Sequence, residues 1–212
     1  MDKKIWILIG ILLLAFIAIS LFALTGTAQP FNDFVYNHIA LSISPATTSA
    51  MKIVSNAGEW FVYVPLALFW LIVPKTRRSI GIPIALVLAA SAIGNILIKE
   101  LFQIARPDGY RLVSITGYGF PSGHAMNGTA FAGICAYLFC KYARKKQWKT
   151  LVTATSVLFV LLVGFSRVYL GVHAATDVIA GYLCGSMIVL AAILIIQTKT
   201  SIRQTSDGEE KE

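Results

Sequence analysis

The sequence has 212 residues, of which 57% are hydrophobic and only 13% are charged. Because a soluble domain carries about 25% charged residues, this chain has too few polar groups to cover a surface exposed to water. The composition excludes a disordered protein, a collagen-like fibre and an ordinary soluble enzyme, and it indicates that many side chains face lipid. The 18 Lys and Arg exceed the 10 Asp and Glu, which gives a formal net charge of +8.

Six apolar segments, nearly free of charge, follow one another along the chain. A membrane-spanning helix needs about 20 apolar residues and tolerates about 17, so each segment is long enough to cross a bilayer. The sequence therefore predicts an all-α fold, a polytopic membrane helix bundle that forms a single domain over 1–212. The expected spans are 5–24, 55–74, 79–98, 124–140, 150–166 and 177–198, and 199–212 form a polar cytoplasmic tail.

The positions of Lys and Arg predict how the bundle is oriented. If both termini are cytoplasmic, thirteen of these cations lie in the cytoplasmic segments and five in the outer ones. This excess follows the positive-inside rule and fits an even number of spans. We therefore expect a multi-pass plasma-membrane protein with an uncleaved first span. The basic charge is interpreted as membrane orientation and contact with anionic lipid, and no nucleic-acid partner is expected.

A short helix is expected between the first two spans. Five mostly apolar residues recur there at the spacing of one helical face: Phe31, Phe34, Val35, His38 and Ile39. We expect this helix to lie on the membrane surface, with Asn32 as its N-cap. Cys135, Cys140 and Cys184 lie in or beside predicted spans without a CxxC motif, so packing roles are expected for them.

The predicted topology brings the unusual polar residues to one membrane face. They occupy the outer ends of the third to sixth spans: Lys99, Arg106, Pro121-Ser122-Gly123-His124, Ser166-Arg167, His173 and Asp177. Ionisable groups at membrane depth are costly and typically functional. Taken singly, Lys99, Arg106 and Arg167 are also consistent with side chains that anchor the protein at the lipid headgroups.

The pair His173 and Asp177 carries the clearest chemical pattern. The two are four residues apart, so they share one face of a helix. An Asp that accepts a hydrogen bond from one ring nitrogen leaves a lone pair on the other, which prepares a nucleophile or a base. A structural His–Asp pair remains an alternative.

The surrounding residues suit a phosphate group. Three fixed cations can neutralise its charge, and Ser122-Gly123-His124 at a helix N-terminus adds backbone amides and a positive dipole end. No cluster of carboxylates is present in the motifs, so a Mg²⁺ site is not expected. The combination predicts metal-free phosphoryl transfer through a histidine.

These motifs also resemble a known family. Lys99-x6-Arg106-Pro107, Pro121-Ser122-Gly123-His124 and Ser166-Arg167-x5-His173-x3-Asp177 are similar to the three-part signature of the type 2 phosphatidic acid phosphatase family. The motifs cover 99–177, and the six-span layout extends the resemblance over most of the chain. In size, and in having no further domain, the chain is similar to the compact bacterial phosphatidylglycerophosphatase B proteins of that family.

The resemblance implies a role for each motif residue. His173 would be the nucleophile that forms a phosphohistidine, Asp177 would orient it, and His124 would be the general acid and then the base that activates water. Because Asp177 alone would raise the pKa of His173, we infer that neighbouring cations keep this histidine neutral. The expected phosphate-binding set is Lys99, Arg106, Ser122, Gly123 and Arg167, with Ser166 and Pro121 in support and no metal or cofactor.

We therefore expect a membrane phosphatase that acts on a lipid phosphate at the extracytoplasmic face. Phosphatidylglycerol phosphate is the first expected substrate, by resemblance. Undecaprenyl pyrophosphate, phosphatidic acid and other isoprenoid diphosphates are alternatives. A non-enzymatic lipid or phosphate carrier would use the same cations but leaves the His173–Asp177 pair unexplained. A vanadate-dependent haloperoxidase shares the site architecture, but the members of that family are soluble and six spans argue against it.

Overall fold

The computed structural model describes residues 2–209, with side chains described for residues 3–199. Over this part of the chain every regular element is a helix and no strand is present, so the all-α prediction is confirmed. The last three residues of the expected polar tail, 210–212, lie outside the described residues. The helices are α1 (Asp2–Leu24), α2 (Gln29–Ala40), α3 (Pro45–Ala57), α4 (Trp60–Ile72), α5 (Pro74–Thr76), a π-helical turn η1 (Arg77–Gly81), α6 (Ile82–Phe102), α7 (Gly123–Tyr142), α8 (Lys146–Tyr169) and α9 (Ala175–Glu209).

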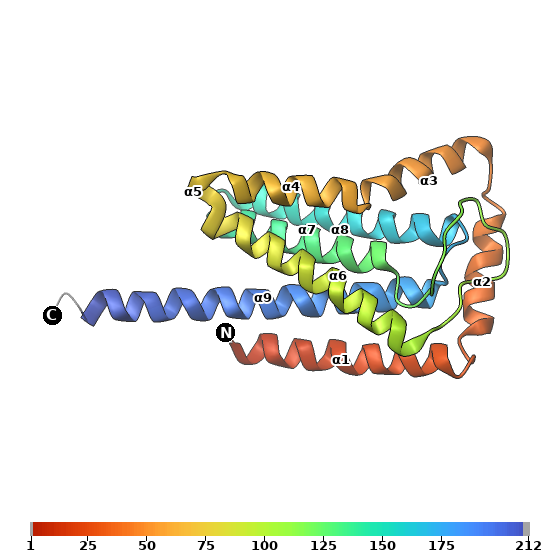
Figure 1. Ribbon diagram of the computed structural model, residues 1–212, viewed down its shortest axis with the longest axis horizontal. Coiled ribbons are helices and arrows are strands. Elements are labelled where there is room, and N and C mark those ends of the chain that lie inside the picture. Colours follow the sequence, from red (N-terminus) through yellow and green to blue (C-terminus); the bar gives the residue numbers. More distant parts are fainter. Residues whose placement is uncertain (1, 210–212) are drawn as a thin grey trace.

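The long helices run side by side as a bundle, with α1 lying along α9 (Figure 1). Helix α2 crosses one end of the bundle, and the irregular segment 103–122 lies at the same end. We call this the site end. The beginning of α1 and the C-terminal part of α9 point to the opposite end, which we call the basic end (Figure 1).

Four helical segments of the described chain are long and apolar enough to cross a membrane: Lys3–Leu24, Pro74–Phe102, Lys146–Tyr169 and Ala175–Lys199. They correspond to four of the six expected spans. The other two overlap α4, which has only 13 residues, and α7, whose first turns are rich in small and polar residues. The six-span count therefore stays a prediction.

The second expected span, 55–74, is not one helix in the structure. It is divided at Gly58, which ends α3, and Glu59, which precedes α4. A Cβ atom at Gly58 would lie 2.5 Å from a methyl group of Val163 in α8, so the glycine allows this junction to pack closely on α8. The break places Ser55 and Glu59 at the site end, beside the last turns of α8.

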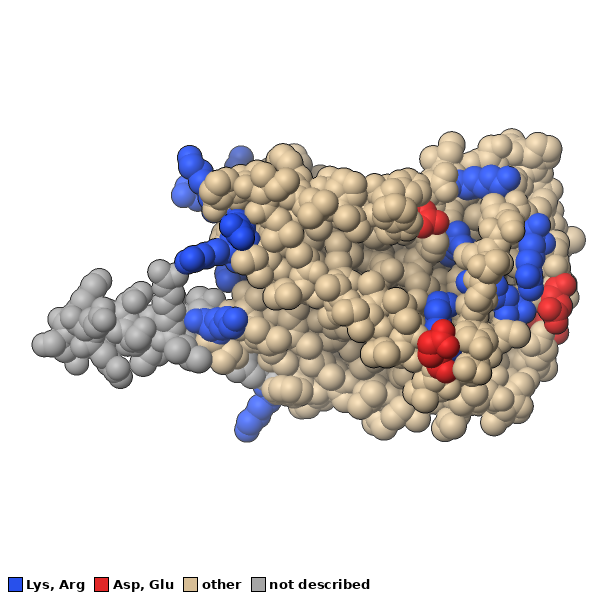
Figure 2. Space-filling model, viewed as in Figure 1, with Lys and Arg blue, Asp and Glu red and all other residues tan. Residues whose placement is uncertain are grey.

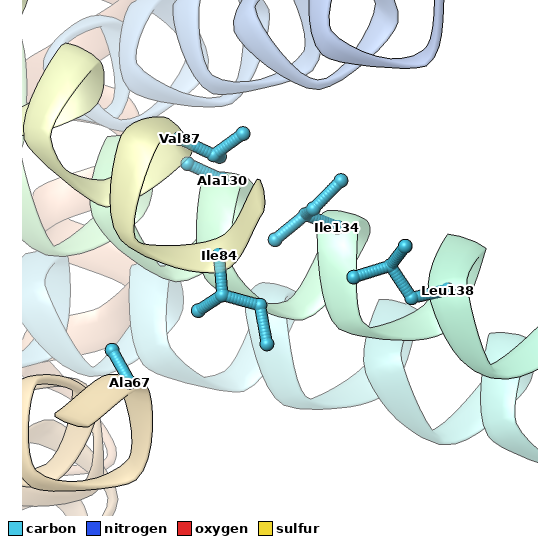
Figure 3. Packing of buried hydrophobic residues seen from close by; sticks show 6 residues of the cluster. All are labelled: Ala67, Ile84, Val87, Ala130, Ile134 and Leu138. Carbon is cyan, nitrogen blue, oxygen red and sulfur yellow. The ribbon is translucent and has the colours of Figure 1, made fainter. Parts of the chain in front are cut away.

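Helix α7 is the centre of the bundle and packs against α6, α8 and α9. Figure 3 shows one apolar cluster of this core, formed by residues of α4, α6 and α7: Ala67, Ile84, Val87, Ala130, Ile134 and Leu138. Helices α7 and α9 approach each other closely at two glycines of α9. A Cβ at Gly181 would lie 2.7 Å from the carbonyl oxygen of Ser122, and one at Gly185 would lie 2.6 Å from that of Met126. Small residues allow such close approach of helices, which sets the start of α7 against the start of α9.

Charged side chains gather at the two ends of the bundle. On the face shown in Figure 2, Lys and Arg lie at both ends and the band between them carries neither charge colour. Many apolar side chains of the long helices are strongly exposed, such as Leu86 at 64% and Ile195 at 58%. An uncharged belt between two charged ends is the pattern expected of helices embedded in a bilayer.

The short helix after the first span is present as α2, but its start differs from the prediction. Helix α2 begins at Gln29, with Pro30 in its first turn, so the expectation that Asn32 is the N-cap is wrong. Asn32 lies inside the helix and reaches Thr176 in α9, where its Oδ1 accepts from the backbone N–H at 3.2 Å and its Nδ2 donates to Oγ1 at 3.1 Å. It therefore satisfies an N–H in the first turn of α9, which has no partner within its own helix.

Candidate active site

The three motif segments meet at the site end of the bundle. Segment 103–122 folds back across α9, and two backbone hydrogen bonds fix it: Leu112 N–H donates to Leu170 O at 3.0 Å, and Ser122 N–H donates to Asp177 O at 2.9 Å. Gly171, with φ of +71°, makes the turn between α8 and α9 in a conformation that favours glycine. The close approach of the Tyr110 carbonyl leaves no space for a Cβ there.

His173 and Asp177 form a buried hydrogen-bonded pair. Each is 2% exposed, and His173 Nδ1 lies 3.2 Å from Asp177 Oδ2. His173 lies in the loop before α9, whereas Asp177 lies in the first turn of α9. The hydrogen bond therefore joins this loop to the start of the helix. The same Oδ2 also accepts from the backbone N–H of Ala174 at 3.0 Å, which fixes the carboxylate.

The second ring nitrogen of His173 faces Arg106. Arg106 Nη1 lies 3.2 Å from His173 Nε2. A guanidinium can only donate, so Nε2 is the acceptor and carries the lone pair, while Nδ1 carries the proton that Asp177 accepts. Contacts from both sides thus select one tautomer of the imidazole, with the lone pair of Nε2 directed at the cation.

The charge state of His173 follows from its surroundings. Burial lowers the pKa of this histidine well below its ordinary value, and the positive charges of Arg106, Arg167, Lys99 and His124 lower it further. The neutral imidazole is therefore the stable form at neutral pH. The cations act in the direction expected from the sequence, although burial is the larger cause.

Arg106 holds the loop as well as the histidine. Its guanidinium donates to the carbonyl oxygens of Val172 at 2.7 Å, Gly117 at 2.9 Å and Thr116 at 3.3 Å. Lys99 Nζ donates to the carbonyls of Tyr118 and Gly119. Two of the three cations expected to bind phosphate, Lys99 and Arg106, therefore donate hydrogen bonds to backbone carbonyls of segment 116–119. A substrate phosphate would compete with these carbonyls for the N–H donors.

The third cation, Arg167, is buried at 4% exposure in the last turn of α8. Its Nη1 donates to the hydroxyl of Ser55, while its Nε has no hydrogen-bond partner among the described residues. Ser122 is fully buried and its Oγ likewise lacks a partner in the described part of the chain. Buried polar atoms are normally satisfied, so these two groups can donate to a ligand oxygen.

The remaining motif residues shape the site. Gly123 begins α7 with Ser122 as its N-cap, and a Cβ at Gly123 would lie 3.0 Å from Asn95 Oδ1. Asn95, a residue that the motifs do not include, donates to the carbonyl of Pro121 at 3.2 Å. Ser166 donates to the carbonyl of Val163 at 2.6 Å within its own helix, so its hydroxyl supports α8 and does not reach the other motif residues.

His124, in the first turn of α7, contacts a carboxylate that sequence reasoning did not assign to the site. Its Nε2 lies 3.0 Å from Glu59 Oε1, and the side chains are 13% and 30% exposed. Ser55 was missed in the same way. The one available signal was that Glu59 is the only charged residue inside an otherwise apolar segment. Nothing in the spacing connects it to His124, which is far away in the sequence.

The described residues contain no group of three or more His, Cys, Asp or Glu side chains that could hold a metal ion. The chemistry available here is that of a neutral imidazole, a second histidine paired with a carboxylate, three cations and the amides at the start of α7.

Comparison with known proteins agrees with this arrangement. The sequence matches the profile of the PAP2 superfamily over residues 4–201. The chain belongs to the PAP2 superfamily. Its sequence is 36% identical to phosphatidylglycerophosphatase B of Bacillus subtilis over 109 residues, which cover 51% of this chain and only about half, 54%, of that protein. It is 28% identical to an undecaprenyl-diphosphatase of Sulfolobus acidocaldarius over 196 residues, 89% of this chain and 91% of the relative.

Solved structures place the PAP2 chain in a membrane-embedded fold. The crystal structure of the transmembrane PAP2-type phosphatidylglycerolphosphate phosphatase from Bacillus subtilis superposes with a TM-score of 0.83 at 27% identity, covering 90% of this chain and 96% of that one. The structure of LpxE from Aquifex aeolicus shares the fold, with a TM-score of 0.64 at 23% identity over 77% of this chain and 94% of that one. The resemblance inferred from the motifs is confirmed, and the relatives support lipid phosphatase activity for this membrane protein.

Proposed function

We propose that this PAP2 chain hydrolyses a phosphate ester of a membrane lipid, with phosphatidylglycerol phosphate as the first candidate, through a phosphohistidine on His173. The observation that carries the proposal is the buried imidazole held between Asp177 and Arg106. Its Nδ1–H is donated to a carboxylate and its Nε2 lone pair faces a cation that suits a phosphoryl oxygen. A histidine needed only for packing would not require a fixed tautomer and a fixed charge partner.

In the proposed first step, His173 Nε2 attacks phosphorus and forms an N–P bond while the bond from phosphorus to the lipid oxygen breaks. The electron pair of the broken bond stays on the leaving oxygen, and His124 gives that oxygen its proton. The positive charge that develops on the His173 ring is stabilised by Asp177. Lys99, Arg106 and Arg167 balance the phosphoryl charge, together with Ser122 and the Gly123 amide.

In the second step, water attacks the phosphohistidine. The water oxygen forms a bond to phosphorus, one water proton goes to His124, and the N–P bond breaks with its electron pair returning to His173 Nε2. Inorganic phosphate leaves, and both histidines are back in their initial protonation states. The neutral form of His173 is required only at the start, which its burial and its cationic neighbours favour.

The proposed topology has six spans, with α4 and α7 completing the four longer segments. Thirteen of the 18 Lys and Arg then lie in the cytoplasmic segments, both termini are cytoplasmic, and the site end faces the extracytoplasmic side of the plasma membrane. The uncharged belt between the charged ends supports a bundle that spans the bilayer. A cysteine introduced in place of Asp108, in the exposed loop at the site end, should react with a membrane-impermeant thiol reagent in intact cells.

The decisive experiment is phosphate release by the purified full-length protein from a panel of lipids: phosphatidylglycerol phosphate, phosphatidic acid and undecaprenyl diphosphate. His173→Ala should abolish release, and brief incubation of the parent protein with ³²P-labelled lipid should label it with acid-labile phosphate. His38→Ala is the matched control, because His38 is exposed on α2 and, among the described residues, its ring contacts Phe34 of its own helix. Full activity of His173→Ala would exclude the mechanism.

Undecaprenyl diphosphate is the second candidate substrate. The supporting observation is the undecaprenyl-diphosphatase relative, whose similarity extends over 89% of this chain. Comparison of kcat/KM across the lipid panel separates the two candidates. A carrier without enzymatic activity would bind the same lipids but would release no phosphate and form no phosphohistidine.

A further inference from the structure

The site contains two histidines, and each one has its own carboxylate. The first pair, His173 with Asp177, is local in the sequence. The second pair, His124 with Glu59, joins the first turn of α7 to the start of α4, with 3.0 Å between Nε2 and Oε1. The proposed reaction starts with His173 neutral and His124 protonated, so the group beside each histidine must favour a different protonation state.

Besides Glu59, the charged groups that act on His124 among the described residues include two cations. They are Arg167 of α8 and Arg106 of segment 103–122. The burial of His124, whose side chain is 13% exposed, disfavours a protonated imidazole most, and the neighbouring positive charges disfavour it further. A carboxylate at 3.0 Å acts in the opposite direction, because it stabilises the imidazolium as an ion pair.

We propose that Glu59 is a positioning residue that keeps His124 in its protonated form, ready to donate to the leaving oxygen of the lipid. This inference rests on the proposed function, because it assigns a partner to the general acid of that reaction. Glu59 does not exchange atoms with the substrate. It acts through His124, which starts the first step with the proton and receives one back from water in the second.

The local structure fixes Glu59 for this role. It is the residue before α4, but its side chain makes no capping hydrogen bond, so helix capping does not account for the acid. Gly58 lets the α3–α4 junction approach α8 closely, where Val163 occupies the space of a side chain. One turn earlier, Ser55 accepts from Arg167. The same junction therefore holds both the cation and the acid partner in place.

A carboxylate in this position also explains an exception in the sequence. An ionisable residue inside an apolar membrane segment is costly unless it has a partner or a function. Glu59 is 30% exposed in its side chain and has a partner in His124, so it is neither fully buried nor free in solvent.

The test uses Glu59→Gln, which keeps the size and the polar end of the side chain but removes its charge. Glu100→Gln is the matched control, since Glu100 is an exposed glutamate at the same end of the bundle, on α6. The measured quantity is kcat/KM as a function of pH, which reports the first chemical step. Two substrates are compared: phosphatidic acid, whose leaving alkoxide needs a proton, and p-nitrophenyl phosphate, whose leaving phenolate does not.

We expect Glu59→Gln to lower kcat/KM for phosphatidic acid about 10- to 100-fold at neutral pH, with much smaller loss for p-nitrophenyl phosphate. The alkaline limb of the phosphatidic acid profile should move about 1–2 pH units toward acid, because the imidazolium has lost its counter-ion. Glu59→Asp should recover part of the activity at neutral pH. Glu100→Gln should behave as the parent protein.

Two outcomes overturn the proposal. One is an unchanged pH profile and an unchanged ratio of the two substrates in Glu59→Gln. The other is an equal loss on both substrates at every pH, which indicates a structural role. The proposed function is tested separately by His173→Ala in the same assay: persistence of activity in that variant refutes the phosphohistidine, whatever Glu59→Gln shows.

Discussion

Replacing Asp177 by Asn tests how much of the reaction depends on a single buried charge. Asp177 Oδ2 accepts two hydrogen bonds, from His173 Nδ1 at 3.2 Å and from the Ala174 backbone at 3.0 Å. An Asn side chain can place its amide oxygen at the same position and keep both. The substitution therefore removes the charge while it preserves the geometry and the tautomer of the imidazole.

The magnitude follows from the contact between the carboxylate and the imidazole ring. An opposite charge at this distance favours a protonated or phosphorylated, cationic ring by about 1–3 pKa units. Since one unit corresponds to about 1.4 kcal/mol, the transition state toward the phosphohistidine loses ~1.4–4 kcal/mol. The expected fall in kcat/KM is about 10- to 1,000-fold.

The assay is kcat/KM on a lipid phosphomonoester in detergent micelles, with thermal unfolding measured on the same preparations. Asp177→Asn should unfold close to the parent temperature. Asp177→Ala should lose stability as well, because it leaves the buried N–H of His173 without an acceptor, at about 1–3 kcal/mol, and the partly buried N–H of Ala174 too. The reasoning is refuted if Asp177→Asn keeps the parental kcat/KM, or if its loss of activity only follows a loss of fold.

Three further predictions rest on other parts of the structure. The folded-state pKa of His173 lies below its unfolded value of about 6.5, so the unfolded chain binds a proton first as pH falls. The free energy of unfolding should therefore decrease below pH 6.5 by up to about 1.4 kcal/mol per pH unit. In thermal unfolding scans, His173→Gln should show a weaker decrease. Gly181→Val should lower the unfolding temperature and the activity together, because its Cβ would press on the backbone of α7, whereas Gly10→Ala on α1, where nothing lies within 4 Å, should be neutral. Asn32→Ala should cost about 1–3 kcal/mol by removing two hydrogen bonds to the start of α9, measured by denaturation in mixed micelles.

The sequence predicts the parts of the site whose residues are close together along the chain. His173 and Asp177 are four residues apart, so a turn beside a helix is enough to bring them together. The sequence Pro121-Ser122-Gly123-His124 also marks the start of α7, because a Ser–Gly pair after proline favours the beginning of a helix. The helical class followed from hydropathy alone.

The missed features depend on contacts between distant segments. Ser55 lies on α3, Glu59 lies just before α4 and Asn95 lies on α6, and no periodicity in these segments shows which neighbour each side chain meets. The break between α3 and α4 was hidden for a related reason, because an apolar run looks continuous whether it forms one helix or two. Asn32 was assigned to its own helix because local capping is the common role of asparagine, whereas its partner is Thr176.

The glycine contact between α7 and α9 has a consequence for the protein in membranes of different thickness. A bilayer that does not match the length of the helices makes them tilt. Gly181 and Gly185 bring the backbone of α9 against the backbone of α7, with no long side chain between them to slide or repack. The two helices should therefore tilt as one rigid body, carrying His124 and Asp177 together, so that changes in lipid composition reorient the site as a whole and leave its internal distances unchanged.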